Sequence, residues 1–335
     1  MQGEELDLSA IVKDVQMRKS ISIRKFWDVL FSFVALSFLI LGLAILLLLI
    51  FQLFVDGRGL LFSWSFYTSF PAPNAAEAGI LSAFVGSLFV ICVTVLFAIP
   101  IGVAAGVYLE EYAKSSSSPA VRILTDFIEI NITNLAGVPS IVYGLLGLEI
   151  FKETFKLGNS VLTAGMTLGI LVLPVIVVTT REALKSVPST LKEGSIAIGA
   201  SKWQTIWDLI LPASIGSILT GVIVSVSRAI GETAPLITVG ALTFIAFLPP
   251  LPFSDRFAPD PQTGELVRAG QYGLFDWLFS GYTVMPIQMF DWVGRPNPEF
   301  RVNAAAAGVV LVLLTLVLNS AAIFLRIYFR RRIKW

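Results

Sequence analysis

The feature that most constrains this 335-residue chain is a series of apolar runs, each long enough to cross a bilayer. An α-helix rises about 1.5 Å per residue, so roughly 20 apolar residues cover the hydrocarbon core. Lipid offers the backbone no hydrogen-bond partner, and such runs are therefore expected to be helical. We predict an all-α, polytopic membrane protein with six transmembrane helices, near residues 27–55, 80–109, 127–151, 159–180, 213–248 and 303–327.

Composition agrees with this prediction and excludes several classes of function. Hydrophobic residues make up 56% of the chain and charged residues 14%, with a mean hydropathy of +0.81, which a soluble domain does not normally reach. The net charge of +1 indicates no nucleic-acid partner. Histidine, the commonest metal ligand and general base, does not occur, so we expect no metal, no cofactor and no catalytic residue. A phosphate loop ending in Gly-Lys is also missing from the sequence, so any ATP must be bound by another chain.

Basic residues near the span ends predict the orientation, because they favour the cytoplasmic side. They gather in the two tails, at Lys13, Arg18, Lys19, Arg24, Lys25, Arg326, Arg330, Arg331, Arg332 and Lys334. We therefore expect a multi-pass protein of the cell membrane with both termini in the cytoplasm. Its predicted parts are a cytoplasmic tail (1–26), a first transmembrane helix (27–55), a core domain with five more (80–327) and a basic cytoplasmic tail (328–335).

Three segments outside the simple apolar pattern carry their own expectations. The third run contains Glu129, Asn131 and Asn134, so it must face protein or water. The outer segment 249–302 is too polar and too rich in Pro and Gly to span, and its aromatic residues predict a short interfacial helix around 271–293. The serine-rich stretch Lys114–Pro119 is expected to be a flexible cytoplasmic turn.

A cytoplasmic loop at 182–212 is longer than a simple connection requires. It consists of two amphipathic pieces joined at Gly199, which can take the positive φ of a turn between helices. Ser201 is a plausible N-cap for a helix through Ile210, and the chain then re-enters the membrane at Pro212. From the residues alone, the loop is either a docking surface for another protein or an interfacial hairpin that serves only the topology.

The fifth run carries two opposite charges, Arg228 and Glu232, four residues apart on one helical face. An arginine at the centre of a bilayer costs about 2.5–3.5 kcal/mol or more, so the pair must face a protected or aqueous interior. One interpretation is a structural ion pair that fixes this helix in its bundle. We favour a functional one, because two apolar residues would pack there without desolvating charge. Gly231 and Pro235 are positioned to break the helix beside the pair.

The cytoplasmic loop resembles the signature of the permeases of binding-protein-dependent ABC importers. That signature is a Glu followed by two small residues, a Gly four positions beyond them and a Leu-Pro whose Pro is thirteen positions after that Gly. This chain matches it with Glu193, Gly194, Ser195, Gly199, Leu211 and Pro212. In the family the loop forms coupling helices that sit in a groove of the ATP-binding subunit. Gly194-Ser195 replaces the usual Ala-Ala, so a bend of the helix is expected at Gly194.

Four further stretches resemble phosphate-importer permeases of the PstA type. They are Arg228–Leu236, Leu135–Gly147, Ile99–Tyr112 and Met285–Phe290. The resemblance implies a substrate path formed by Arg228, Glu232, Ser140, Tyr143 and Asn134. A guanidinium can bind an oxyanion, and the hydroxyls of Ser140 and Tyr143 could donate to one. For Gly137, Gly144 and Gly147 we favour a second interpretation, in which small residues let two helices approach closely.

The resemblance also implies a fold, that of the MetI-like permeases of type I ABC importers, and a set of partners. These are a PstC-like permease forming a heterodimer, a dimer of ATP-binding subunits on the cytoplasmic face, an extracytoplasmic phosphate-binding protein and the lipid bilayer. ATP hydrolysis would belong to the separate subunit. Three alternatives stay open: a permease for another oxyanion such as molybdate or sulfate, a non-conducting membrane scaffold or sensor partner, and, less favoured, a secondary transporter.

Overall fold

The computed structural model describes residues 8–114, 118–259 and 266–332. The ends of the two predicted tails (1–7 and 333–335) and the centre of the predicted serine-rich turn (115–117) lie outside these residues. So do the side chains of the basic residues used to orient the chain, apart from Arg24, Lys25 and Arg326. The described chain divides into two units, Met1–Val55 and Asp56–Trp335.

The described residues of the first unit form a single helix. Helix α1 is continuous from Leu8 to Leu61, longer than the predicted span 27–55, and ends within the second unit. Its apolar side chains between Phe26 and Val55 are exposed on all sides. A helix that is apolar all round cannot stand in water, so this one needs lipid or other transmembrane helices around it.

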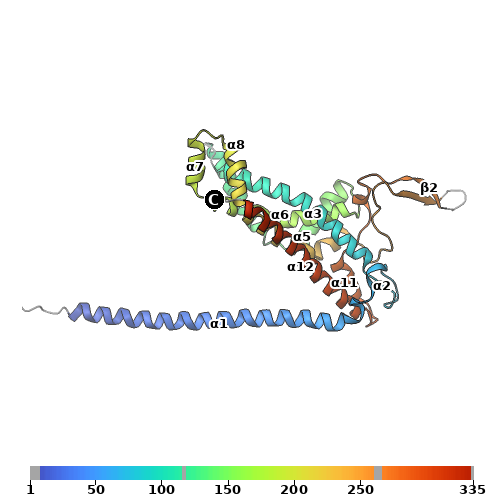
Figure 1. The fold of residues 1–335 in the computed structure, drawn as a ribbon, viewed down its shortest axis with the longest axis horizontal. Coiled ribbons are helices and arrows are strands. Elements are labelled where there is room, and N and C mark those ends of the chain that lie inside the picture. Colours follow the sequence, from blue (N-terminus) through green and yellow to red (C-terminus); the bar gives the residue numbers. More distant parts are fainter. Residues whose placement is uncertain (1–7, 115–117, 260–265, 333–335) are drawn as a thin grey trace, which may run out of the picture. The chain divides into compact units, whose positions relative to one another are not determined.

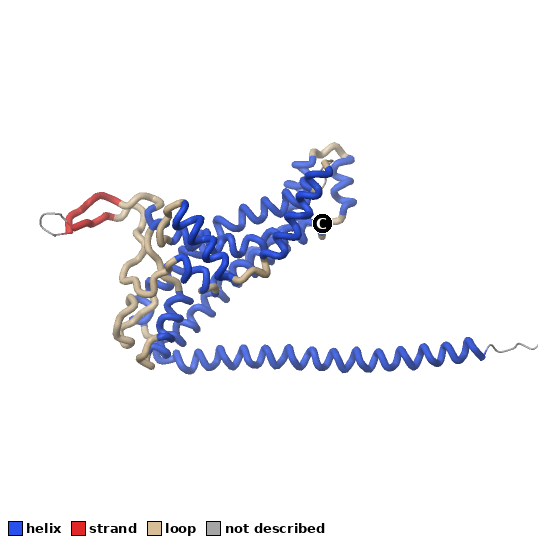
Figure 2. Tube along the Cα trace, turned by 180° about the vertical axis from the view of Figure 1, so that it is seen from behind, coloured by secondary structure: helices blue, strands red, loops and turns tan. Residues whose placement is uncertain are grey.

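The second unit is a bundle of helices with one small hairpin (Figures 1 and 2). The elements after α1 are α2 (Trp64–Thr68), α3 (Leu81–Val107), η1 (Tyr108–Ala113), α4 (Pro119–Leu135), α5 (Ser140–Gly147), η2 (Leu148–Thr154), α6 (Val161–Lys185), α7 (Ser189–Ala197), α8 (Lys202–Gln204), η3 (Thr205–Ile210), α9 (Leu211–Gly231), α10 (Ala234–Val239), β1 (Asp255–Pro259), β2 (Leu266–Gln271), η4 (Asp276–Phe279), α11 (Met285–Gly294) and α12 (Phe300–Arg332). The elements η1, η2 and η3 are π-helical turns that continue or begin longer helices.

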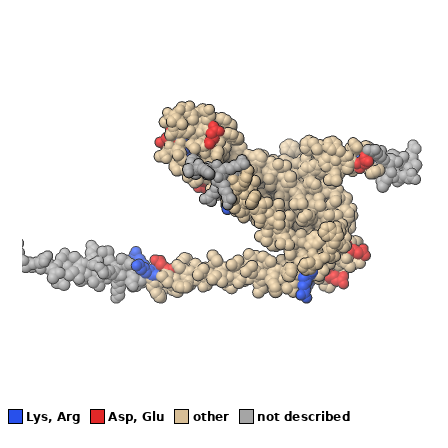
Figure 3. All heavy atoms as spheres, in the orientation of Figure 1, with Lys and Arg blue, Asp and Glu red and all other residues tan. Residues whose placement is uncertain are grey.

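The predicted fold class is confirmed. Five helices of the described chain are long and apolar enough to cross a membrane, and six if the bent pair of α4 and α5 counts as one span. Figure 3 shows that, on the face in view, the charged side chains of the second unit lie toward its two ends and leave its middle uncharged. That distribution suits a body whose middle lies in hydrocarbon.

Two predicted spans differ from the structure. The third run is not a straight helix, since its direction changes by 109° between α4 and α5. Pro139 has no N–H to donate and disfavours helical backbone at Val138, which explains the break. The fifth run does not continue to residue 248. Helix α9 ends at Gly231, Glu232 takes an extended conformation (φ −76°, ψ 127°), and the short α10 follows.

Helices α3 and α6 form the centre of the second unit, and glycines bring them together. A Cβ at Gly102 would lie 2.6 Å from Ile176 Cγ2, and one at Gly106 would lie 2.7 Å from Thr180 Cβ. These helices therefore approach more closely than alanine would allow, which is how transmembrane helices gain contact without a hydrophobic driving force. The end of the bundle that carries α11 has its own apolar cluster, in which Trp292 packs with Phe66 and Phe300.

The outer segment contradicts the prediction of one helix around 271–293. The 3-10 turn η4 is followed by extended residues and then by α11. Ser280 and Gly281 end the helical turn, and Pro286 suits the first turn of a new helix. The antiparallel hairpin of β1 and β2 was not predicted. Its register shifts between Arg256 and Phe257, as in a β-bulge.

Candidate translocation path and coupling loop

Helix α9 leaves one face uncovered along its length. The residues Ser217, Thr220, Val224, Arg228 and Gly231 are exposed and follow one another at intervals of three or four, which places them on one face; we call them the α9 stripe. The adjoining face, about 100° around the helix, is packed, with Ser214, Ile218, Gly221, Ser225 and Ala229 buried. Because exposed polar groups are costly in lipid, the stripe must face water or another protein.

Arg228 and Glu232 form the predicted ion pair near the Gly231 end of the stripe. Arg228 Nε lies 3.3 Å from Glu232 Oε1, with side-chain exposures of 44% and 18%. This bond uses one of the five N–H donors of the guanidinium. Nearly half of the arginine side chain is open on the face of the stripe, so its charge can be reached from outside the chain.

The register of α9 against α6 places Arg228 at the middle of the membrane-spanning bundle. A Cβ at Gly221 would collide with the Cβ of Thr179, and the two helices run in opposite directions from the loop that joins them, so Arg228, further along α9, is level with Leu171 and Val172. Leu171 and Val172 lie near the centre of α6, which begins at Val161 and ends at Lys185. The neighbouring Arg228 is therefore at a depth where an unpartnered charge would be unstable in lipid.

The polar residues predicted on α4 and α5 are arranged differently from one another. Asn134 is exposed at the end of α4 and Ser140 is half-buried at the start of α5. Tyr143 is buried. Its hydroxyl donates to the carbonyl of Leu135 at 2.6 Å. This hydrogen bond stabilises the break between α4 and α5, so the hydroxyl hydrogen does not point at the α9 stripe.

Two of the α5 glycines have a packing role. A Cβ at Gly144 would lie 2.6 Å from Pro235 Cα, and one at Gly147 would lie 2.5 Å from Thr167 Cγ2. Both positions therefore let α5 touch its neighbours α10 and α6 directly. At Gly137 the closest neighbour is the carbonyl of Asn134 at 3.4 Å, so tight packing does not explain that glycine.

A groove of about 470 Å³ between α6 and α9 extends the stripe away from Arg228. The stripe residues Ser217, Thr220 and Val224 line one side of it. From α6 it is lined by Val178, Thr179, Glu182, Ala183 and Ser186. Sequence reasoning missed these residues, although the spacing of Ser217, Thr220 and Arg228 was a usable signal. Arg326 of α12 was predicted only as an orienting residue, yet it donates to Thr220.

The cytoplasmic loop forms two helices at a sharp turn, as predicted. Gly199 has φ +94°, and the Ser201 hydroxyl accepts from the backbone N–H of Gln204 at 3.3 Å in a capping box. Helix α7 runs from Ser189 to Ala197 without a break at Gly194. The second helix does not end at Ile210 but continues through η3 into α9. Leu211 and Pro212 therefore lie inside one long helix.

The signature residues of α7 lie on the outside of the loop. Glu193, Gly194 and Gly199 are exposed, and Ser195 is half-buried, with its hydroxyl 3.0 Å from that of Thr205. Ile198 is 87% exposed, unusually high for an isoleucine in a helical hairpin. The loop thus offers both a carboxylate and an apolar side chain to whatever covers it.

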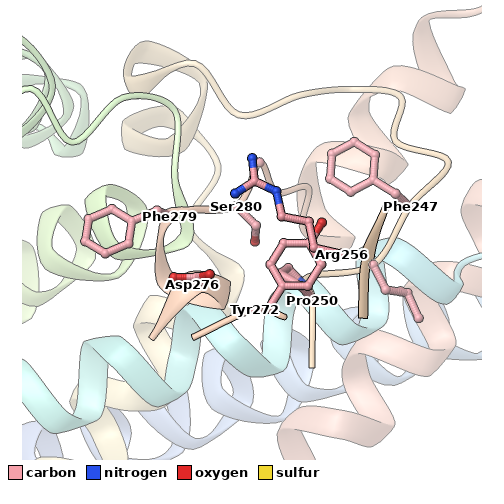
Figure 4. A pocket seen from close by; sticks show the side chains of 9 residues that line it. Phe247, Pro250, Arg256, Tyr272, Asp276, Phe279 and Ser280 are labelled. Atoms are coloured by element: carbon pink, nitrogen blue, oxygen red, sulfur yellow. The ribbon is translucent and has the colours of Figure 1, made fainter. Parts of the chain in front are cut away.

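The outer segment contains a separate pocket of about 520 Å³ beside the hairpin (Figure 4). Arg256 lies over the ring of Tyr272, with its Cζ 6.0 Å from the ring centroid, and Asp276 accepts from the backbone N–H of Gly273 at 2.8 Å. The pocket is lined by residues between 247 and 281, and it contains none of the residues predicted for the substrate path.

Comparison with known proteins places these features in a family. The model of the family described as "binding-protein-dependent transport system inner membrane component" matches residues 98–335. The chain is 33% identical over 263 residues to the probable ABC transporter permease protein YqgI of Bacillus subtilis (strain 168), covering 78% of this chain and 82% of that one. It is 31% identical over 304 residues to the phosphate transport system permease protein PstA of Pasteurella multocida (strain Pm70), covering 90% and 93%.

The fold is also found in solved structures. An inward-facing structure of the MetNI methionine ABC transporter superimposes with a TM-score of 0.51 at 16% sequence identity, covering 73% of this chain and 94% of that one. At this identity the similarity concerns the fold alone. It agrees with the predicted MetI-like architecture.

Proposed function

Because the chain belongs to the family of binding-protein-dependent transport system inner membrane components, we propose that it is the permease subunit of an ATP-driven importer of inorganic phosphate. The observation that carries the proposal is the half-exposed guanidinium of Arg228, at the middle of the bundle on a stripe of α9 residues that stay exposed in the described part of the chain. The names of relatives at 30–33% identity, several of them phosphate transport permeases, support phosphate as the substrate.

In this proposal the α9 stripe lines half of the translocation path, and a PstC-like permease supplies the other half. The planar guanidinium of Arg228 offers paired donors to a phosphate oxyanion. Glu232 competes for one of those donors at 3.3 Å, which keeps the site from holding phosphate too tightly for transport. Ser140 and Asn134 lie on the elements next to the path and are secondary contacts.

The cytoplasmic loop couples this path to ATP hydrolysis in a separate subunit. Glu193, Gly194, Ser195 and Gly199 form the face that docks into a dimer of ATP-binding subunits, while Leu211 and Pro212 carry the loop into α9. This subunit itself has no catalytic role. Both termini are cytoplasmic, and the outer segment 249–302 faces a phosphate-binding protein on the other side of the membrane.

The test is uptake of radiolabelled phosphate by proteoliposomes that contain the whole complex. Arg228→Gln is expected to lower uptake by about tenfold or more while the complex still assembles, because the pair of charge-assisted donors is worth about 1.5–3 kcal/mol. Arg301→Gln is the matched control, since Arg301 is an exposed arginine in the first turn of α12, outside the path. Normal uptake by Arg228→Gln in a normal complex would remove Arg228 from the mechanism.

The same vesicles separate the rival functions. An excess of molybdate or sulfate should leave phosphate uptake unchanged; strong competition would favour a permease for another oxyanion. A scaffold that does not conduct predicts that phosphate uptake persists when this chain is left out of the complex.

A further inference from the structure

The π-helical turn η1, at the end of α3, holds both helices of the coupling loop. Lys192 Nζ of α7 lies 2.5 Å from Glu111 Oε1. On the other side of the turn at Gly199, Lys202 Nζ of α8 lies 4.9 Å from the ring centroid of Tyr112. Adjacent residues of one turn thus receive one cation from each arm of the loop. Single π-helical turns within α-helices are frequent at functional sites.

The ion pair between Lys192 and Glu111 is largely shielded from water. The exposures of the two side chains are 24% and 9%. Attraction between charges is stronger in such surroundings than on an open surface, where ion pairs contribute little. Removing one partner would leave the other charge poorly solvated, so this contact resists separation when the loop moves.

Chain connectivity shows why this contact matters for transport. The loop continues directly into α6 at one end and through η3 into α9 at the other, so both helices follow its motion covalently. Helix α3 has no such connection, since Glu111 and Lys192 are 81 residues apart. The hydroxyls of Ser195 and Thr205 lie 3.0 Å apart and join α7 to η3, so the two arms are positioned to move together.

The neighbouring acid, Glu110, serves the bundle instead of the loop. Its Oε2 lies 3.0 Å from Lys114 Nζ and 3.4 Å from the buried Arg181 of α6, and Arg181 also binds Glu129 of α4 at 2.5 Å. The two consecutive carboxylates of η1 therefore have different roles. Glu110 joins α3 to α6 and α4, and Glu111 joins α3 to the coupling loop.

We propose that Lys192 and Glu111 are positioning residues that pass the movement of the coupling loop to α3. The proposal rests on the proposed function and adds the contact through which a third membrane helix takes part. Breaking the pair should leave α3 linked to the loop only through its contacts with α6, so that ATP hydrolysis moves α3 less effectively. An ion pair with only a structural role would instead lower assembly, ATP hydrolysis and uptake together.

The experiment measures ATP hydrolysis and uptake of radiolabelled phosphate in the same proteoliposomes. Glu111→Gln and Lys192→Gln should each lower phosphate taken up per ATP by about fivefold or more while most of the hydrolysis is retained. The charge exchange Glu111→Lys with Lys192→Glu should restore the ratio to within about twofold of wild type. Asp291→Asn is the matched control, because it breaks a pair of similar burial with Arg295 (21% and 22% exposed) in α11, away from the loop.

A proportional fall in hydrolysis and uptake, an unchanged ratio, or no rescue by the charge exchange would overturn the proposal. If the glutamine variants do not assemble, Glu111→Asp replaces them, because it keeps the charge but shortens the side chain by one methylene. This variant must also lower the phosphate taken up per ATP, and an unchanged ratio overturns the proposal. Failure of the proposed function is distinguishable, since the wild-type complex would then take up no phosphate with ATP.

Discussion

The guanidinium of Arg326 in α12 donates to the hydroxyl oxygen of Thr220 in α9 at 2.9 Å. The Thr220 hydroxyl donates its own hydrogen bond to the carbonyl of Gly216 at 2.9 Å, so its oxygen only accepts from the arginine. Thr220 and Arg228 are both on the α9 stripe, eight residues or about 12 Å apart along the helix axis. The last helix of the chain therefore adds a second cation to the stripe that carries Arg228.

A second cation on the path should help phosphate leave toward the cytoplasm. Arg326→Gln is expected to lower the maximal rate of phosphate uptake about three- to tenfold, while Arg326→Lys keeps most of it, because charge matters more than the fork geometry when the neutral partner is a single hydroxyl. The measurement is the initial rate at saturating phosphate, with Arg301→Gln as the control. Full uptake by Arg326→Gln would leave this arginine with an orienting role only.

Tyr143 offers a test of whether its hydroxyl supports the fold or contacts the substrate. Tyr143→Phe removes the bond to Leu135, so the free energy of unfolding should fall by about 1 kcal/mol, with a lower Tm and uptake largely retained. If the hydroxyl instead donated to the substrate, Tyr143→Phe would lower uptake and leave the Tm unchanged. If Tyr143→Phe abolishes uptake at an unchanged Tm, the hydroxyl acts on the anion.

Two glycines of α9 should respond with opposite signs to the same substitution. A Cβ at Gly221 would collide with the Cβ of Thr179, an atom fixed to the backbone of α6, so Gly221→Ala should destabilise the bundle by about 1–3 kcal/mol. At Gly216 a Cβ would meet nothing within 4 Å, so Gly216→Ala should stabilise the helix by up to about 1 kcal/mol. The Tm of the purified chain in detergent measures both. Equal shifts would show that α6 and α9 are not in close contact at Gly221.

The sequence predicted what depends on local chemistry. Apolar runs predicted six spans, and the described chain has five spanning helices, or six with the bent pair of α4 and α5. Gly199 and Ser201 predicted the turn of the loop, and α9 ends at Gly231, where a break was expected. The break between α4 and α5 was missed although Pro139 marks it, because a long apolar run was read as one span. The hairpin was missed because strand pairing joins residues that no local pattern relates.

The site could be predicted only in part, for a physical reason. The charges of Arg228 and Glu232 stand out in an apolar helix, so the pair was visible. Which face of α9 stays open is decided by the packing of α6 and α12, so the lining by Ser217 and Thr220 was not. The contact of Arg326 crosses 106 residues, and a basic residue at a helix end is typical of any membrane protein.

The exposed carboxylate of Glu193 should carry the docking of the loop onto the ATP-binding subunit. Glu193→Lys reverses the charge on the outside of α7 without touching the core, so the chain should fold with an unchanged Tm. In the complex it should lower ATP-driven uptake about tenfold or more, either by uncoupling hydrolysis from transport or by weakening assembly, because a reversed charge at an interface costs several kcal/mol.

Co-purification of the ATP-binding subunit and the ratio of uptake to hydrolysis tell these two routes apart. The control is Glu153→Lys, the same reversal at an exposed glutamate in η2, away from the loop, which should change neither quantity. If Glu193→Lys assembles and transports as well as this control, α7 docks through its apolar side chains instead. Ile198, which directly follows α7 and is 87% exposed, is then the first to replace, since Ile198→Ala would remove the apolar contact without changing any charge of the loop.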